Sequence, residues 1–171
     1  YTANADSDAA ALILYAKDVT ISGLQVDAKI TATSGDSTVR SGLIGTVASS
    51  SAAKLTDCTV NLTLTATSGQ CGAFVGLAES GSTLTMTNCK ATGSMTFRTL
   101  SSSGAGGLVG KCSAAKMENC TNEVSIVLDS TKGKNIGGLI GASSGNLDLN
   151  GCVNYGAITN KRTSSASSAG A

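Results

Sequence analysis

The residues best suited to chemistry in this 171-residue chain are its six cysteines, which occur without any histidine. Four of them recur at intervals of 31, 31 and 32 residues: Cys58, Cys89, Cys120 and Cys152. Thiolates bind zinc or pair as disulfides, but zinc needs ligands from several directions and no CxxC is present. We favour a third interpretation, in which each cysteine is a small buried hydrophobe. No metal or other cofactor is therefore expected.

Carboxylates are the second group that could do chemistry, because an enzyme that cleaves polysaccharides holds two of them in one groove. The candidates are Asp57, Glu118, Glu123, Asp129 and Asp148. They are spread along the chain, which favours solvated surface charges. The lack of histidine excludes the zinc-peptidase motif and His-dependent catalytic triads. We therefore predict a non-catalytic protein, with a carbohydrate-active β-helix enzyme as an alternative.

Composition narrows the possible partners. The net charge is +1 with dispersed charges, so neither nucleic acid nor an anionic membrane surface is indicated as a partner. No apolar run reaches the length of a membrane span, and no signal segment opens the chain. Aromatic residues make up 3% and proline is absent, whereas serine and threonine are abundant. This mixture suits stacked strands with small and β-branched side chains.

The elements that position the cysteines recur with the same period. Each cysteine follows a motif that ends in glycine: "SGLIG" at Gly45, "GAFVG" at Gly76, "GGLVG" at Gly110 and "GGLIG" at Gly141. An earlier copy, 20–35, aligns without gaps on 54–69 and places Leu24 opposite Cys58. The segment "ALILYA" then stands where the first motif would be. The chain therefore contains five units, with the least regular ones at the ends.

Within each unit, apolar residues alternate with polar ones around the cysteine. Three residues before it, or before Leu24, stand Ile21, Leu55, Met86, Met117 and Leu149. A period of two indicates strands with one buried face, and no segment has a helical period. Three short strands and three turns fit 31–34 residues, with glycine at turns or at positive φ. We predict a parallel β-solenoid, right-handed by the crossover rule, with coils about 4.8 Å apart.

These units resemble the GLUG repeat, named for its Gly-Leu-apolar-Gly motif. The resemblance rests on "GGLVG" and "GGLIG" together with "NCKATGSM" and "GCVNYGAI", and covers residues 41–160. That family occurs in secreted and surface-attached bacterial proteins, including immunoglobulin A peptidases and large adhesin-like proteins. The resemblance implies a β-solenoid that serves as a stalk or recognition surface. The first unit departs from the family pattern, because it lacks both the motif and the cysteine.

The consecutive apolar pair inside each motif is not explained by strand alternation. On a strand the two side chains must face opposite ways. Either the neighbouring glycine forms a bulge that turns both inward, or one row lies on the surface. An exposed row would be an apolar stripe and a candidate interaction surface. Its members would be Ile44, Val75, Val109 and Ile140.

Two polar patterns have structural and functional readings. Asp57, Asn88 and Asn119 precede their cysteines, either as turn residues, which we favour, or as an inward hydrogen-bonding ladder. Threonines spaced T-x-T, such as Thr63 and Thr65, could form an array that orders water and binds ice. The equivalent positions in other units are mixed, however, and threonine is common on exposed strands. Ice binding is therefore a further alternative.

We divide the chain into a degenerate first coil (1–35), regular coils (36–160) and a flexible Ser/Ala-rich tail (161–171). The expected role is a non-catalytic structural or adhesive segment of a bacterial surface or secreted protein, located outside the cell. Its partner would be a host or bacterial surface protein, or a glycan. Because the ends of a solenoid expose unpaired strand edges, end-to-end stacking into a filament is another alternative.

Overall fold

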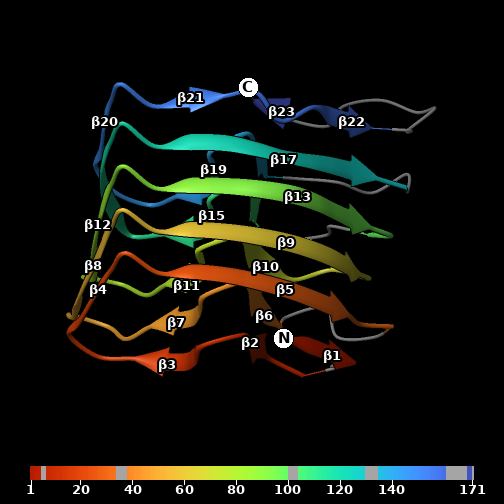
Figure 1. Ribbon diagram of the computed structural model, residues 1–171, viewed down its shortest axis with the longest axis horizontal. Helices are drawn as coiled ribbons and strands as arrows, with labels where there is room; N and C mark the ends of the chain where they lie inside the picture. Colours follow the sequence, from red (N-terminus) through yellow and green to blue (C-terminus); the bar gives the residue numbers. More distant parts are fainter. Residues whose placement is uncertain (5–6, 34–37, 100–103, 130–134, 161–168, 171) are drawn as a thin grey trace.

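The computed structural model describes residues 1–4, 7–33, 38–99, 104–129, 135–160 and 169–170. Over these residues the chain contains strands and no helix, and all strand pairs are parallel. The strands stack into a β-solenoid of about five coils, which confirms the predicted fold class. In Figure 1 the chain starts in the lowest coil and ends in the uppermost one.

Four sheets, here named A to D, run along the solenoid. Sheet A, which faces the viewer in Figure 1, contains the longest strands. Its strands are β1 (Thr2–Asn4), β5 (Gln25–Thr31), β9 (Thr59–Ala66), β13 (Lys90–Phe97), β17 (Thr121–Leu128), β21 (Val153–Asn154) and β22 (Ile158–Asn160). Sheet B contains β2 (Ala9–Ala10), β6 (Val39–Ser41), β10 (Gln70–Gly72), β14 (Ala105–Gly106), β18 (Ile136–Gly137) and β23 (Ala169–Gly170).

Sheets C and D complete each coil, so a coil has four strands. Sheet C contains β3 (Ile13–Ala16), β7 (Ile44–Val47), β11 (Val75–Ala78), β15 (Val109–Cys112) and β19 (Ile140–Ser143). Sheet D contains β4 (Val19–Ser22), β8 (Ala52–Thr56), β12 (Thr83–Thr87), β16 (Ala114–Glu118) and β20 (Leu147–Asn150). The expectation of three strands per coil is therefore wrong. The extra strand arises because the Gly-Leu-Ile-Gly motif is a corner between two strands.

The motif makes this corner between sheets B and C with two residues. Strand β6 ends at Ser41 and β7 begins at Ile44. The two sheets approach backbone to backbone: a Cβ added to Gly110 would lie 2.5 Å from the Gly76 oxygen and 2.6 Å from the Cys71 nitrogen. Among the described residues, the positive-φ glycines are elsewhere: Gly23, Gly69, Gly81, Gly93 and Gly151. The closing glycines of the motif thus provide close approach rather than positive φ.

Equivalent residues of successive coils stack in register and form the core. One inward column pairs Ile21 with Leu55, then Met86, Met117 and Leu149. A second column on sheet A pairs Ile30 with Leu64, then Met95, Ile126 and Ile158. The first unit also folds as a coil, because Ile13 pairs with Ile44 despite the missing motif. Most of the expected tail lies outside the described residues; Ala169 and Gly170 pair with β18.

Candidate functional site

The candidate interaction stripe is not on the surface. Ile44, Val75 and Val109 have an exposed fraction of 0%, and Ile140 in the last coil is half-buried. Their neighbours Leu43 and Phe74 are equally buried. Both members of each pair face inward because the pair lies at the corner between sheets B and C, where the chain turns and alternation fails. The hypothesis of an external apolar row is therefore wrong, and a corner takes the place of the proposed bulge.

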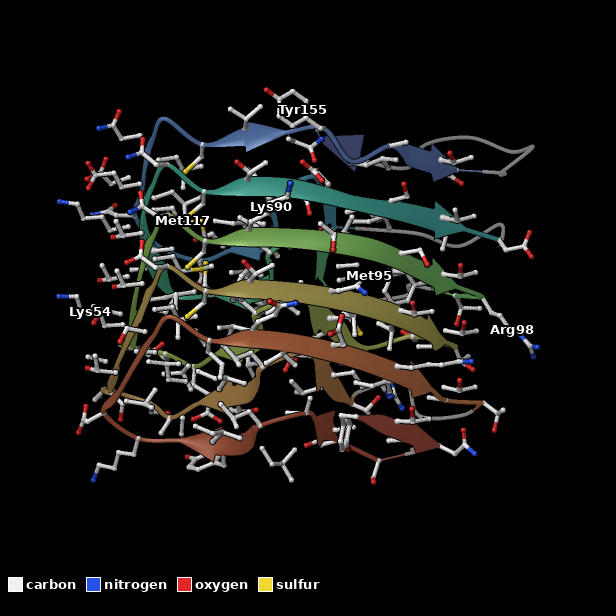
Figure 2. All side chains as sticks on the ribbon, viewed as in Figure 1. Lys54, Lys90, Met95, Arg98, Met117 and Tyr155 are labelled. Atoms are coloured by element: carbon white, nitrogen blue, oxygen red, sulfur yellow. The ribbon has the colours of Figure 1, made fainter. Side chains whose placement is uncertain are left out.

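The four periodic cysteines form one column at the corner between sheets D and A. The backbone N–H of Lys90 donates to the Cys58 oxygen at 2.9 Å, and that of Thr121 to the Cys89 oxygen at 2.8 Å. Cys58, Cys89 and Cys120 are buried and Cys152 is half-buried. In Figure 2, yellow sulfur atoms lie one above another at the start of the sheet A strands. The column is confirmed, with Leu24 in the corresponding place of the first coil, because the Thr59 N–H donates to its oxygen.

Each column thiol donates to the backbone oxygen two residues earlier, at 3.2 Å from Cys58 to Thr56 and 3.4 Å from Cys89 to Thr87. All six cysteines are free thiols. No group of three or more histidine, cysteine or acidic side chains suited to a metal ion occurs within the part of the chain that the structure describes. These cysteines therefore fill the corner as small buried groups with a satisfied S–H, as expected of buried cysteine.

Hydrogen bonding and burial set the acidity of the thiols. The hydrogen bond with Cys89 lowers the pKa of Cys120 to about 7, and the same bond, together with burial, raises the pKa of Cys89. Burial raises the pKa of Cys71 to about 12, against an opposing effect of the Arg40 charge. Burial also raises the pKa of Cys152. Because Cys120 has no exposed surface, its acidity gives it no access to a substrate; only Cys152 is within reach of solvent.

The residue before each cysteine turns the corner. Gly23, Asp57, Asn88, Asn119 and Gly151 all have φ between 52° and 64°. Asn88 Nδ2 donates to Asp57 Oδ1 at 2.9 Å, and Asn119 Nδ2 reaches Asn88 Oδ1 at 3.5 Å. These side chains are exposed. The favoured turn interpretation is confirmed, and the ladder that accompanies it lies on the surface instead of inside.

An inward asparagine ladder does exist, at two positions that we did not select from the sequence. Asn122 has an exposed fraction of 0%, and its Nδ2 donates to Asn154 Oδ1 at 2.7 Å. Its Oδ1 accepts the Val124 N–H at 3.0 Å. A Cβ added to Gly107 would lie 2.2 Å from Asn122 Nδ2. The signal was available: asparagine stands two residues after Cys120 and after Cys152, at an inward position of the strand.

Sheet A presents the broadest outward face, because β9, β13 and β17 each contain eight residues. Its polar side chains form bonds along the solenoid axis. Asn61 Nδ2 donates to Asp27 Oδ1 at 3.0 Å, and Thr92 Oγ1 lies 3.3 Å from Asn61 Oδ1. Lys90 and Glu123 form an exposed ion pair at 2.7 Å. The threonine-containing columns through Thr63 and Thr65 lie side by side on this face.

The five candidate carboxylates occupy different places. Asp57 lies at the D–A corner, Glu123 on sheet A beside Lys90, and Asp129 directly after β17. Glu118 and Asp148 both point outward from sheet D. They are out of register, because Glu118 pairs with Asn150 and Asp148 with Lys116. Lys116 Nζ lies 3.9 Å from Asp148 Oδ2.

A shallow hollow of about 310 Å³ lies on sheet D near the last coil. It is lined by Thr83, Leu84, Thr85, Ala114, Ala115, Lys116, Asn146, Leu147 and Asp148. Asp148 is the only one of the five candidate carboxylates in this lining. The hollow therefore lacks the acid pair that glycoside cleavage requires.

Comparison with protein-family models, with curated proteins and with solved structures gave no match. Within the described residues, no helix is long and apolar enough to cross a membrane.

Proposed function

We propose that this chain is a non-catalytic structural or adhesive repeat segment, a stalk or binding module of a bacterial surface or secreted protein. The observation that carries the proposal is the residue-by-residue stacking of sheet A, in which all eight residues of β9 pair in order with β13 and all eight of β13 with β17. Such stacking makes the length of the segment proportional to its number of coils. The resemblance of the motifs to the GLUG repeat supports an extracellular setting.

The binding surface in this proposal is the outward face of sheet A. It is wide, and most of its outward residues carry hydroxyl, amide or charged groups, although the residue type at equivalent positions differs between coils. A host or bacterial surface glycan, or a surface protein, could contact several coils at once, so that weak contacts add up. The alternative enzymatic function has less support, because the candidate carboxylates are dispersed over four parts of the solenoid.

Binding to a glycan array and to intact bacterial and host cells tests the adhesive role. Ser94→Arg on sheet A should weaken binding severalfold. Thr85→Arg, at a similarly half-buried outward position on sheet D, should leave it unchanged. Equal loss with both variants, or no binding to any cell or glycan, would argue against sheet A as the binding face. Cleavage of a polysaccharide that is lost in Asp148→Asn would overturn the non-catalytic proposal.

The stalk role is tested by removing one coil. Deletion of residues 59–89 removes one coil and joins Cys58 to Lys90. Cys58 then precedes Lys90, as the equivalent Cys89 does in the intact chain, so the path of the chain is preserved. We expect a folded protein about 4.8 Å shorter, and an equally longer one when the same segment is duplicated. The measurement is the maximum dimension from X-ray scattering. Unfolding of both variants would show that the coils are not interchangeable spacers.

A further inference from the structure

The cysteine column places two thiols of the middle coils next to each other in the core. Cys89 and Cys120 occupy the same corner of successive coils, because the Thr121 N–H donates to the Cys89 oxygen at 2.8 Å. Both side chains are buried, and strands β9 and β21 lie on either side of these two coils in sheet A. Stacked residues are about 4.8 Å apart at Cα, within the span of about 4.4–6.8 Å that disulfides bridge. The backbone therefore already provides the spacing of a disulfide.

The contacts of the thiols distinguish this pair from the other neighbours in the column. The Cys120 thiol forms hydrogen bonds with the thiols of Cys89 and Cys152, and the bond with Cys89 has the larger effect on its acidity. Cys89 forms a hydrogen bond with the backbone of Cys58, on its other side. The Cys58 thiol itself lies 3.8 Å from the Ile21 oxygen of the preceding coil. Cys89 and Cys120 are therefore the neighbouring thiols that interact most strongly.

We propose that Cys89 and Cys120 form a disulfide when the chain folds in the presence of a disulfide oxidant, either a small molecule or a protein. The bond closes residues 89–120 into a covalent ring that contains one complete coil, from β13 to β16. The free thiols described above are the reduced form of this site. An extracellular setting, as in the proposed function, supplies such oxidants, but the pairing itself depends only on the cysteine column.

Two thiol–disulfide exchanges form the bond. The Cys120 thiolate first attacks one sulfur of the oxidant, for example oxidised glutathione, and releases one glutathione thiolate. The Cys89 thiolate then attacks the Cys120 sulfur of the mixed disulfide and releases the second. In total, two protein thiols and one oxidised glutathione become one protein disulfide and two reduced glutathiones, which take up the two thiol protons. Because both cysteines are buried in the folded chain, the first exchange takes place before the corner closes.

The ring changes how the solenoid responds to tension, a consequence that rests on the proposed stalk function. When the ends of a reduced chain are pulled, every coil can unwind and lengthen the chain. With the disulfide in place, force passes from Cys89 to Cys120 through the sulfur–sulfur bond, so the residues between them are not extended. The middle of the stalk thus keeps its coil until a thiol reductant opens the ring.

Refolding in a glutathione redox buffer tests the pairing. The reduced chain is diluted from urea into reduced and oxidised glutathione, remaining thiols are blocked with iodoacetamide, and the folded fraction is isolated by gel filtration. Proteases that cut after lysine, arginine and glutamate place Cys89 in peptide 80–90 and Cys120 in peptide 119–123, apart from the other cysteines. Cys71 and Cys112 are internal controls, because no cysteine is paired with either in its sheet. Mass spectrometry without reduction identifies the linked peptides.

We expect the linked peptides 80–90 and 119–123 to exceed every other linked pair at least about tenfold, with Cys71 and Cys112 blocked as free thiols. Absence of this link in folded protein, or pairing of Cys58 with Cys89 and of Cys120 with Cys152, would overturn the assignment. Native reduced protein given the same buffer should yield at least about tenfold less, and an equal yield would overturn closure before the corner is buried.

Single-molecule pulling tests the ring. The 30 residues between the two cysteines are excluded from extension, so the oxidised chain should lengthen by about 110 Å less than the reduced chain. Cys120→Ala, refolded in the same buffer, should extend fully. Equal extension of the oxidised chain and Cys120→Ala would overturn the ring. The coil-deletion experiment addresses the stalk role separately, because its failure would leave the peptide link unchanged.

Discussion

Asn122 and Asn154 are linked inside the solenoid, between the last two coils, by a 2.7 Å hydrogen bond from Nδ2 to Oδ1. Each asparagine side chain also bonds to the backbone two residues further along the chain, Asn122 to Val124 and Asn154 to Gly156. In the earlier coils the same column contains Val26, Val60 and Ala91. The column therefore changes from apolar to amide at the C-terminal end, where the amide groups satisfy one another and the backbone.

Asn122→Ala should lower the free energy of unfolding by about 1–3 kcal/mol, because the half-buried Asn154 amide loses a partner and the buried Val124 N–H loses its acceptor. A double-mutant cycle with Asn154→Ala should give a coupling energy of at least about 0.5 kcal/mol. The matched control is Asn61→Ala, an exposed asparagine on sheet A, with an effect within about 0.5 kcal/mol. Urea denaturation measures the unfolding free energy of all five proteins: the wild type, the two single variants, the double variant and the control. Additive effects of the two inward asparagines would contradict the ladder.

Gly110→Ala should be among the most damaging single substitutions, because backbone atoms surround the added Cβ on more than one side. We expect a loss of more than about 3 kcal/mol or failure to fold. Gly23→Ala is the control, since its φ is +64° and its added Cβ meets nothing within 4 Å. Strain alone should cost it about 1–2 kcal/mol. Similar denaturation midpoints for the two variants would show that sheets B and C do not approach as closely as described.

Cys71 should make the protein sensitive to alkali. Its pKa rises from 9.0 to about 12 on folding, chiefly through burial, so the native state keeps a proton that the unfolded chain releases. This contribution is complete below pH 9 and declines as pH rises toward 12, by about 1.4 kcal/mol per unit. Cys71→Ala, which matches Ala105 in the same column, should therefore lose stability less steeply between pH 9 and 11. Parallel curves of unfolding free energy against pH would contradict this assignment.

Thiol labelling should distinguish the ends of the cysteine column. A bulky maleimide should label Cys152 alone in the native protein, because the other five cysteines are buried. Since burial raises the pKa of Cys152, labelling should be slower than for a free cysteine at neutral pH and accelerate as pH rises. Mass spectrometry of peptides identifies the labelled site. Equally fast labelling of Cys89 would show that the column is open to solvent.

The sequence pattern was sufficient to predict the columns but not the outline of a coil. A strict interval between cysteines, and the apolar residues three positions before them, determine which side chains stack. The predicted number of three strands per coil was wrong because of the corners. A two-residue corner such as Gly42–Leu43, in which φ stays negative, cannot be distinguished from a strand in the sequence. The same corner explains why Ile44 is buried, since alternation predicts orientation only within a strand.

Features that depend on only two coils were harder to predict. The amide pair of Asn122 and Asn154 occurs in the last two coils alone and matches Gly107 and Gly138 on the neighbouring corner. A column that is apolar in three coils obscures such an exception. Buried Arg40 is a similar case: it lies in the column of Cys71, and its Nη1 donates to the Ser68 oxygen at 2.9 Å. Neither the asparagine pair nor Arg40 could be predicted from the repeat, because their residue types do not recur at the equivalent positions of the other coils.

The central claim is that equivalent residues of successive coils form straight columns along one axis. Spin labels test it directly when one is attached at Lys29→Cys and the other at Thr63→Cys, Ser94→Cys or Ser125→Cys, in a Cys152→Ser background. These positions form one outward column on sheet A. We predict distances between the label sites of about 5, 10 and 14 Å, one constant step of about 4.8 Å per coil. Distances that do not increase in equal steps would contradict the solenoid and every proposal built on it.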